Sequence, residues 1–384
     1  MTKHELRATI FLSWIFMLRM LGLFMIMPVF SVYAETINGG NNVVLVGMAL
    51  GAYGVAQSLL YIFYGLASDR FGRKPVITVG LLIFSFGSFI SACANHITWI
   101  IVGRIVQGMG AVSSAVLAFI ADVTSEKNRT KAMAIVGGSI GVSFAVAIVC
   151  TPIMFQWIGM SGLFALIGAL SMLSIAVLIW MVPDPGKREY TPKSFREVLY
   201  DTNLHRLNFS VLTLHATQTA LFLVVPRLLV DFGLPVISHW KVYFPIIGLS
   251  FIMIVPAIII AEKHGKIKLF LLVGISAILI SQLLLSTVSY NMLTIITILF
   301  IYFLGFNLLE AIQPSIVSKI ASSSSKGMAI GVYNTTQSIG LALGGIVGGY
   351  LLKHGGHNIL FLSCSVLVLF SLISAIRIKL LRVE

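Results

Sequence analysis

The sequence predicts an all-α membrane protein with twelve transmembrane helices in two pseudo-symmetric six-helix halves. Three observations predict it: an apolar composition, a series of apolar stretches of membrane-spanning length, and a repeat that relates the two halves. Of 384 residues, 58% are hydrophobic and 10% are charged, and the mean hydropathy is +0.99. Soluble domains carry about 25% charged residues. The surface of this chain must therefore face lipid.

The apolar stretches have the length of membrane helices. A helix needs about 20 apolar residues to cross the hydrocarbon core. The stretches lack the period-2 alternation of barrel strands, so we expect helices. The predicted spans are 8–33, 43–64, 75–94, 97–120, 132–157, 161–182, 206–231, 237–261, 267–288, 291–316, 327–352 and 357–381.

The basic residues predict the orientation. The net charge is +13, and with both termini inside, 21 of the 26 Lys and Arg residues lie on cytoplasmic segments or their flanks. Positive charge collects on that side of membrane proteins, so we expect a multi-pass protein of the bacterial inner (cytoplasmic) membrane with cytoplasmic N and C termini. The same rule accounts for the positive net charge, so nucleic-acid binding is not needed to explain it.

A repeat divides the chain. Asp69-Arg70-Phe71-Gly72-Arg73 aligns with Glu262-Lys263-His264-Gly265-Lys266 at an offset of 193, and Lys131 to Ile135 aligns with Lys326 to Ile330 at 195. Paired halves suit a transporter whose substrate site is exposed alternately to each side. We expect an N-terminal half over 1–182, a cytoplasmic linker over 183–205 that includes a short amphipathic helix or a solvated loop, and a C-terminal half over 206–384.

The loop between the second and third spans carries the clearest motif. Only a few residues turn the chain there, which predicts a positive φ at Gly72. Asp69 is expected to accept hydrogen bonds from the amino end of the third span. With Gly65, Arg70 and Arg73, this segment resembles motif A of the major facilitator superfamily.

Two further segments extend the resemblance. Arg104 to Gly110 resembles motif B, which implies proton coupling at Arg104; the alternative is a structural arginine that ties helices together. Arg19 to Gly22 in the first span and Asn307 to Glu310 in the tenth resemble the YajR-type branch of the drug:proton antiporters. Members of that branch usually add a small cytoplasmic domain, which we do not expect after Glu384.

The resemblance also implies a conformational gate. An acid at the inner end of the fourth span meets the motif A residues in this superfamily, so Asp69, Arg73 and Asp122 are expected to form a charge cluster. Such a cluster is bistable because it forms in one conformation and breaks in the other. The alternative is a plain surface salt bridge, worth about 0–1 kcal/mol.

The fifth span departs from the antiporter pattern. Motif C calls for Gly-Pro followed by paired glycines, whereas this chain has Thr151-Pro152. The departure leaves the direction of transport open. In the eleventh span, Gly340, Gly344 and Gly348 form a stripe that we interpret as helix packing.

Glu310 is the only acid deep within a predicted span, and we expect it to be the main proton carrier. The alternative is a fixed structural pair with Arg19 or another donor. His215 is a second candidate for proton coupling, or a structural hydrogen-bonding residue. The residues expected to line a substrate cavity are Tyr53, Gln57, Gln107, Gln218, Asn307, Gln313, Tyr333, Asn334 and Gln337.

The sequence lacks a phosphate-binding loop, metal-ligand spacing and a convergent nucleophile and base, so we expect no enzyme, no cofactor and no metal. It favours a monomeric, proton-coupled secondary transporter that exports hydrophobic or amphipathic compounds. Its partners would be a small-molecule substrate, protons and the lipid bilayer, without nucleic acid. The alternatives are an importer of a small metabolite and a non-transporting membrane sensor.

Overall fold

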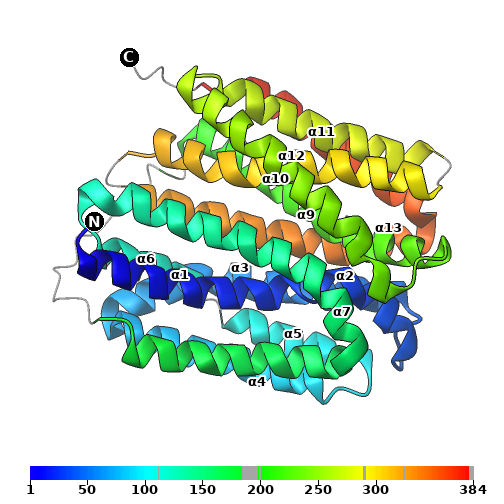
Figure 1. Ribbon diagram of the computed structural model, residues 1–384, viewed down its shortest axis with the longest axis horizontal. Helices are drawn as coiled ribbons and strands as arrows, with labels where there is room; N and C mark the ends of the chain where they lie inside the picture. Colours follow the sequence, from blue (N-terminus) through cyan, green and yellow to red (C-terminus); the bar gives the residue numbers. More distant parts are fainter. Residues whose placement is uncertain (111, 184–197, 199, 289–290, 323–324, 380–384) are drawn as a thin grey trace. The chain divides into compact units, whose positions relative to one another are not determined.

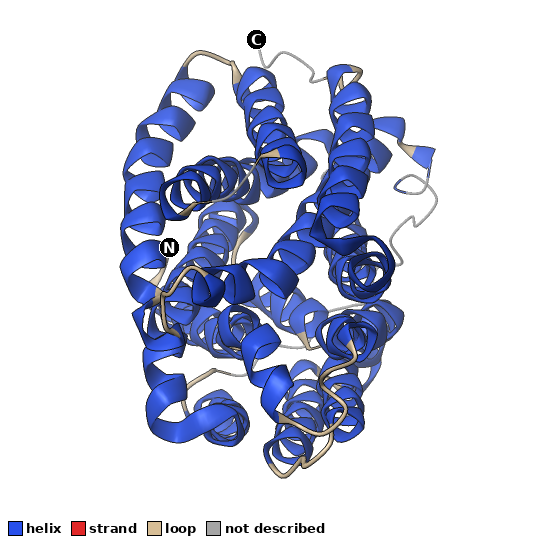
Figure 2. Cartoon of the chain, turned by 90° about the vertical axis from the view of Figure 1, so that its right-hand side faces the viewer, coloured by secondary structure: helices blue, strands red, loops and turns tan. Residues whose placement is uncertain are grey.

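The computed structural model describes residues 1–110, 112–183, 198, 200–288, 291–322 and 325–379. Figure 2 shows these residues as helices joined by loops. The chain divides into two compact units, Met1–Leu45 with Ala52–Pro192, and Val46–Gly51 with Lys193–Glu384. Half of the predicted amphipathic helix, residues 193–197 and 199 of its range 193–204, lies outside the described residues.

The described residues of the first unit form the α-helices labelled α1 to α7 in Figure 1. They are α1 (Lys3–Phe24), α2 (Met27–Tyr33), α3 (Val43–Phe71), α4 (Arg73–Ala92), α5 (Ile97–Met109), α6 (Ser113–Val123) and α7 (Glu126–Trp180), with the 3-10 turn η1 (Ala34–Thr36) after α2. Within this unit α7 packs against α1 and α4, and α4 packs against α5.

In the described part of the second unit, the main α-helices are those labelled α9 to α13 in Figure 1. They are α9 (Thr202–Asp231), α10 (Trp240–Lys263), α11 (Ile267–Thr287), α12 (Met292–Ile320) and α13 (Lys326–Ile376), with the 3-10 turn η2 (Val236–Ser238) before α10. Here α13 packs against α9 and α11, and α12 packs against α10 and α11.

The predicted number of spans is recovered once two long helices are divided. The described residues contain ten helical segments that are long and apolar enough to cross a membrane. Two of them, in α7 and α13, break at Gly159 (φ 63°) and Gly356 (φ 68°), where the backbone leaves the helical region. Positive φ favours glycine because it has no Cβ. Dividing both gives twelve segments, and the all-α fold class is confirmed.

Two predicted spans are interrupted. The first breaks at Met25–Ile26, and α2 then starts with Pro28 in its first turn, where proline needs no hydrogen-bonded N–H. The fourth is divided into α5 and α6 beside Gly110, whose ψ of 46° ends α5. Apolar composition alone does not reveal these interruptions, because the residues on either side are equally apolar.

Side-chain caps fix where several helices begin. Thr2 and Glu5 form a capping box at the start of α1, and the Asp201 carboxylate accepts from the backbone N–H groups of Asn203 and Leu204 at the start of α9. Such caps satisfy N–H groups that the helix leaves unpaired. The membrane helices therefore start at defined residues.

Candidate functional site

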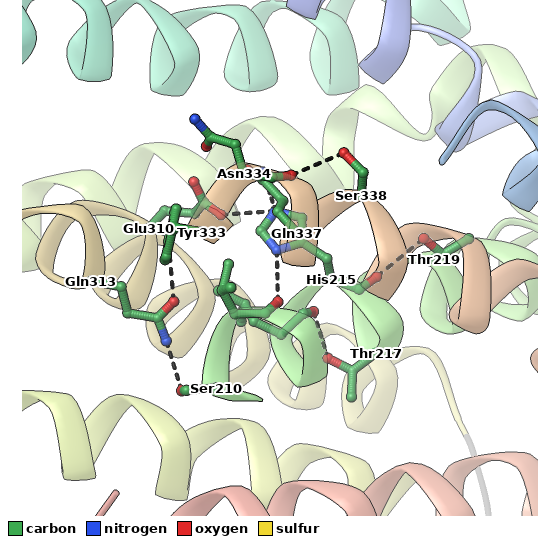
Figure 3. A network of polar contacts seen from close by, with 12 residues as sticks. Ser210, His215, Thr217, Thr219, Glu310, Gln313, Tyr333, Asn334, Gln337 and Ser338 are labelled. Atoms are coloured by element: carbon green, nitrogen blue, oxygen red, sulfur yellow. Dashed lines mark hydrogen bonds and ion pairs between the residues drawn. The ribbon is translucent and has the colours of Figure 1, made fainter. Parts of the chain in front are cut away.

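An acid and a buried histidine meet inside the second unit. Glu310 Oε1 lies 2.9 Å from His215 Nε2, joining α12 to α9 (Figure 3). The His215 side chain is 1% exposed and that of Glu310 is 23% exposed. Glu310 precedes the last residue of α12, Ile320, by ten positions, which is about 15 Å at 1.5 Å per residue. The pair therefore lies far from the helix end.

The contacts of His215 define where its protons are. Nδ1 lies 3.1 Å from the carbonyl oxygen of Val211. A carbonyl only accepts, so Nδ1 carries a hydrogen. In neutral imidazole Nε2 then has a bare lone pair, and an ionised carboxylate would be repelled at 2.9 Å. A proton on either residue would remove this repulsion; the contact is a close approach of two titratable groups, because Glu310 Oε1 has no hydrogen-bond partner among the described residues.

A third helix reaches the same nitrogen. Gln337 Nε2 on α13 lies 2.7 Å from His215 Nε2, so residues from α9, α12 and α13 converge at one ring nitrogen (Figure 3). The Phe306 ring packs against the imidazole in an edge-to-face arrangement, with 5.9 Å between the ring centroids. Of the residues predicted from sequence for proton coupling, Glu310 and His215 are thus brought together.

A second polar chain runs beside this pair. The Tyr333 hydroxyl donates to Gln313 Oε1 at 3.3 Å, and Gln313 Nε2 donates to the Ser210 hydroxyl at 2.8 Å (Figure 3). Gln313 is completely buried. These bonds connect α13, α12 and α9 one turn from Glu310, so two of the predicted cavity residues hold the helices together.

Other predicted cavity residues have different surroundings. Asn307 donates to Ser250 on α10 at 2.8 Å, which places it against another helix rather than beside Gln313. Gln218 is completely buried, and neither amide atom has a hydrogen-bond partner among the described residues. Asn334 points away from His215, and its backbone carbonyl accepts from Ser338 at 3.0 Å (Figure 3).

The first unit buries two arginines around one tyrosine. Arg19 donates to the hydroxyls of Ser113 and, at 2.6 Å, of Tyr53. The Arg104 guanidinium lies 4.8 Å from the centre of the Tyr53 ring, within cation–π distance. The Arg19 and Arg104 side chains are both almost inaccessible to solvent. Tyr53, predicted for the cavity, therefore supports two buried cations.

Arg104 also belongs to a hydrogen-bonded chain. Its NH1 donates to Gln107 Oε1 at 2.9 Å, and Gln107 Nε2 donates to Ser88 at 2.7 Å. Gln57 lies one turn after Tyr53 on α3 and is buried. In the described residues Glu310 pairs with His215, whereas the contacts of Arg19 are with hydroxyl groups.

The motif A residues form a charge cluster within the first unit. Arg73 NH1 lies 2.5 Å from Asp69 Oδ1, and Arg73 Nε lies 2.7 Å from Asp122 Oδ2. The Ser68 hydroxyl accepts from Arg73 NH1 at 2.6 Å. One guanidinium thus joins the ends of α3 and α6. The expected contact between Asp69, Arg73 and Asp122 is present in the structure.

The turn of this motif is partly as predicted. Gly72 has φ 93°, which confirms the expected positive φ, and Gly65 lies in the last turns of α3. The expected capping by Asp69 is wrong: α4 begins at Arg73 without a side-chain cap, because the Asp69 carboxylate is directed to the Arg73 guanidinium. Arg70 is exposed and lies over the Phe71 ring at 5.4 Å, apart from the cluster.

Sequence reasoning missed the serines at these sites. Among the described residues, five serines each bond the side chain of a predicted functional residue: Ser68, Ser88, Ser113, Ser210 and Ser250. Serine is common in apolar helices and often bonds its own backbone, so its type gives no signal of its partner. What distinguishes these five serines from the others is the helix face on which each one lies.

Comparison with known proteins identifies the family. The profile described as "Major Facilitator Superfamily" matches residues 12–345 and again 207–383. The chain is 40% identical over 357 residues to "Inner membrane transport protein YajR" of Escherichia coli K12, covering 91% of this chain and 78% of that protein. It is also 25% identical to "Multidrug resistance protein 2" of Bacillus subtilis, covering 86% of this chain and 85% of that protein.

Solved structures show the same fold. A bacterial homolog of the human lysosomal transporter Spinster, in an inward-facing and occupied conformation, gives a TM-score of 0.76 at 16% identity, covering 98% of this chain and 96% of that one. The human organic anion transporter MFSD10 gives 0.72 at 16% identity, covering 97% and 99%. The family match spans most of both units. The chain belongs to the major facilitator superfamily.

Proposed function

We propose that this major facilitator transporter is proton-coupled and exports hydrophobic or amphipathic compounds by alternating access. The observation that carries the proposal is the contact between Glu310 and His215, which places two titratable side chains 2.9 Å apart and far from the helix ends. An ionised acid within the bilayer is costly, whereas a protonated or paired one is tolerated. Such a pair suits a proton carrier that exchanges its proton only when water reaches it.

The named relatives support export of drug-like compounds. Besides the protein already described, the chain is 27% identical to "Multidrug resistance protein 1" of Bacillus subtilis and 25% identical to "Quinolone resistance protein NorA" of Staphylococcus aureus. An importer of a small metabolite is the second candidate, because Thr151-Pro152 replaces the Gly-Pro of the antiporter motif. Both candidates use the same proton carrier.

Everted membrane vesicles distinguish the candidates. With ethidium as a lipophilic cation, we expect accumulation inside everted vesicles when their lumen is acidic, and its loss when the pH gradient is collapsed. Vesicles from cells without the protein provide the background. Uptake that is independent of the gradient would contradict proton coupling. Ethidium movement only out of everted vesicles would favour the importer.

The proposed orientation places both termini in the cytoplasm of a monomeric inner-membrane protein. It predicts that Asn41→Cys is labelled by an impermeant maleimide on whole cells and that Tyr190→Cys is not. The background would lack Cys93, Cys150 and Cys364, because Cys93 is itself exposed. Labelling of the Tyr190→Cys variant with protection of Asn41→Cys would reverse the topology.

A further inference from the structure

Gln337 and Glu310 compete for one atom of His215. Gln337 Nε2 lies 2.7 Å from His215 Nε2, and Glu310 Oε1 lies 2.9 Å from the same nitrogen (Figure 3). An imidazole nitrogen has one lone pair or one hydrogen, so it forms one strong hydrogen bond at a time. We propose that Gln337 is a positioning residue that takes over His215 Nε2 when the proton leaves the His215–Glu310 pair. The proposal rests on the proposed proton coupling.

The two protonation states use different helices. With the proton present, it lies between Nε2 and Oε1, and the main bond joins α9 to α12. Loss of the proton to water leaves a bare lone pair on Nε2 beside a carboxylate, and the Gln337 amide N–H then donates to Nε2 without a competitor. The bond from Nδ1 to the Val211 carbonyl is the same in both states. On deprotonation, the main hydrogen bond of His215 on α9 therefore changes its partner from Glu310 on α12 to Gln337 on α13.

Close packing of α9 and α13 keeps Gln337 within reach. A Cβ atom added at Gly340 would overlap the carbonyl oxygen of Leu212, and one added at Gly344 would overlap that of Ala216. Both glycines follow Gln337 on α13, and Ala216 is next to His215. The packing predicted for the glycine stripe thus sets the distance between Gln337 and the imidazole, so the amide changes its bond without a change in helix separation.

Near neutral pH, the titratable groups that surround the His215–Glu310 pair do not change their charge, so a change in pH acts on the pair itself. Those within the packed helices are tyrosines and a cysteine, whose ordinary pKa values of about 8.5 to 10 keep them neutral near pH 7. They are Tyr302 on α12, Tyr333, Tyr350 and Cys364 on α13, and Tyr243 on α10. On α11 the one titratable side chain among the described residues is Lys268, in the first turn. The other charged side chains and histidines of α9, α10, α12 and α13 lie in end turns or beside the break at Gly356.

Gln337→Met tests the proposal because methionine has a similar length and forms no strong hydrogen bond. The full chain in liposomes is titrated between about pH 5 and 9 by infrared difference spectroscopy, with protons as the only probe. The signal is the set of bands that the wild type shows and Glu310→Gln lacks. We expect the midpoint of this signal to move upward by about one pH unit, because only the deprotonated pair depends on Gln337 as its donor.

Two further variants make the result specific. Thr336→Val removes a hydroxyl that bonds its own helix at the Val332 carbonyl, 2.8 Å away, and should leave the midpoint unchanged. Gln337→Ala gives a second measurement with less steric demand, and it replaces Gln337→Met if that protein does not fold. An upward shift in the Gln337 variants, with an unchanged Thr336→Val midpoint, supports the proposal.

The outcomes separate this proposal from the proposed function. If Glu310→Gln removes the titrating bands and both folded Gln337 variants keep the wild-type midpoint, the role of Gln337 is overturned and the proton carrier remains. If the wild type and Glu310→Gln have identical titrations, the proton carrier itself is wrong, and the inference fails with it. A downward shift in the Gln337 variants also contradicts the proposal, because it would mean that the amide stabilises the protonated pair.

Discussion

Glu310→Gln is expected to fold and bind substrate but to lose pH-driven transport. The amide keeps the size of the carboxyl group and still contacts His215 by turning its N–H toward the bare Nε2. It cannot take up or release a proton, so the site stays in one charge state. Accumulation of ethidium driven by a pH gradient should fall to the level of empty liposomes, while exchange of ethidium without a gradient is retained.

A matched variant controls for the loss of a carboxylate. Glu262→Gln makes the same chemical change in the last turn of α10, away from the His215 pair, and should transport like the wild type. Thermal unfolding of the purified Glu310→Gln protein tests the structural alternative. If the variant unfolds or fails to insert, Glu310 holds His215 in a fixed pair; if it is well folded and still accumulates ethidium with a pH gradient, another group carries the proton.

Asp69→Asn is expected to slow transport while leaving insertion intact. Arg73 is 13% exposed at its side chain and meets Asp69, Asp122 and Ser68, so the cluster is partly shielded from water. Loss of one charge from a partly exposed pair costs about 1 kcal/mol, which changes the ratio of two conformations roughly fivefold. We expect a shift away from the state in which the cluster forms, measured as a lower transport rate across the pH range.

The chain supplies a control with the same spacing. Arg227 and Asp231 also form an i,i+4 pair, at 2.9 Å, but their side chains are 44% and 48% exposed. Asp231→Asn should have little effect, because exposed pairs of this kind contribute little. Asp122→Asn, which removes the contact between α3 and α6 through Arg73, should resemble Asp69→Asn. Wild-type transport by both Asp69→Asn and Asp122→Asn would show that the cluster is only a surface salt bridge.

The sequence predicts the helices of this protein well because lipid imposes a simple rule on them. A stretch of about 20 apolar residues must be helical in a membrane, since its backbone has no other hydrogen-bond partners. The short gaps at 158–160 and 353–356 were enough to predict the breaks that the structure places at Gly159 and Gly356. A helix end within an apolar stretch, such as the end of α5 beside Gly110, is not accompanied by a gap in the apolar sequence and was not predicted.

The candidate site was predicted by residue type but not by partner. Glu310 and His215 are rare polar groups in apolar helices, so each is conspicuous, and yet nothing in the spacing of residues 215 and 310 says that they meet. Arg19 was the named alternative partner for Glu310, and its described contacts are instead the hydroxyls of Ser113 and Tyr53. Pairings between helices depend on rotation and packing, which a single sequence does not contain.

The most direct test of proton coupling measures proton and ethidium fluxes together in the same proteoliposomes. A pH-sensitive dye inside the vesicles reports protons, and ethidium fluorescence reports the solute. Proton coupling through Glu310 predicts opposite movements of protons and ethidium in a fixed ratio for the wild type, and no proton movement for Glu310→Gln at equal ethidium binding. Proton movement in Glu310→Gln equal to that of the wild type would contradict it.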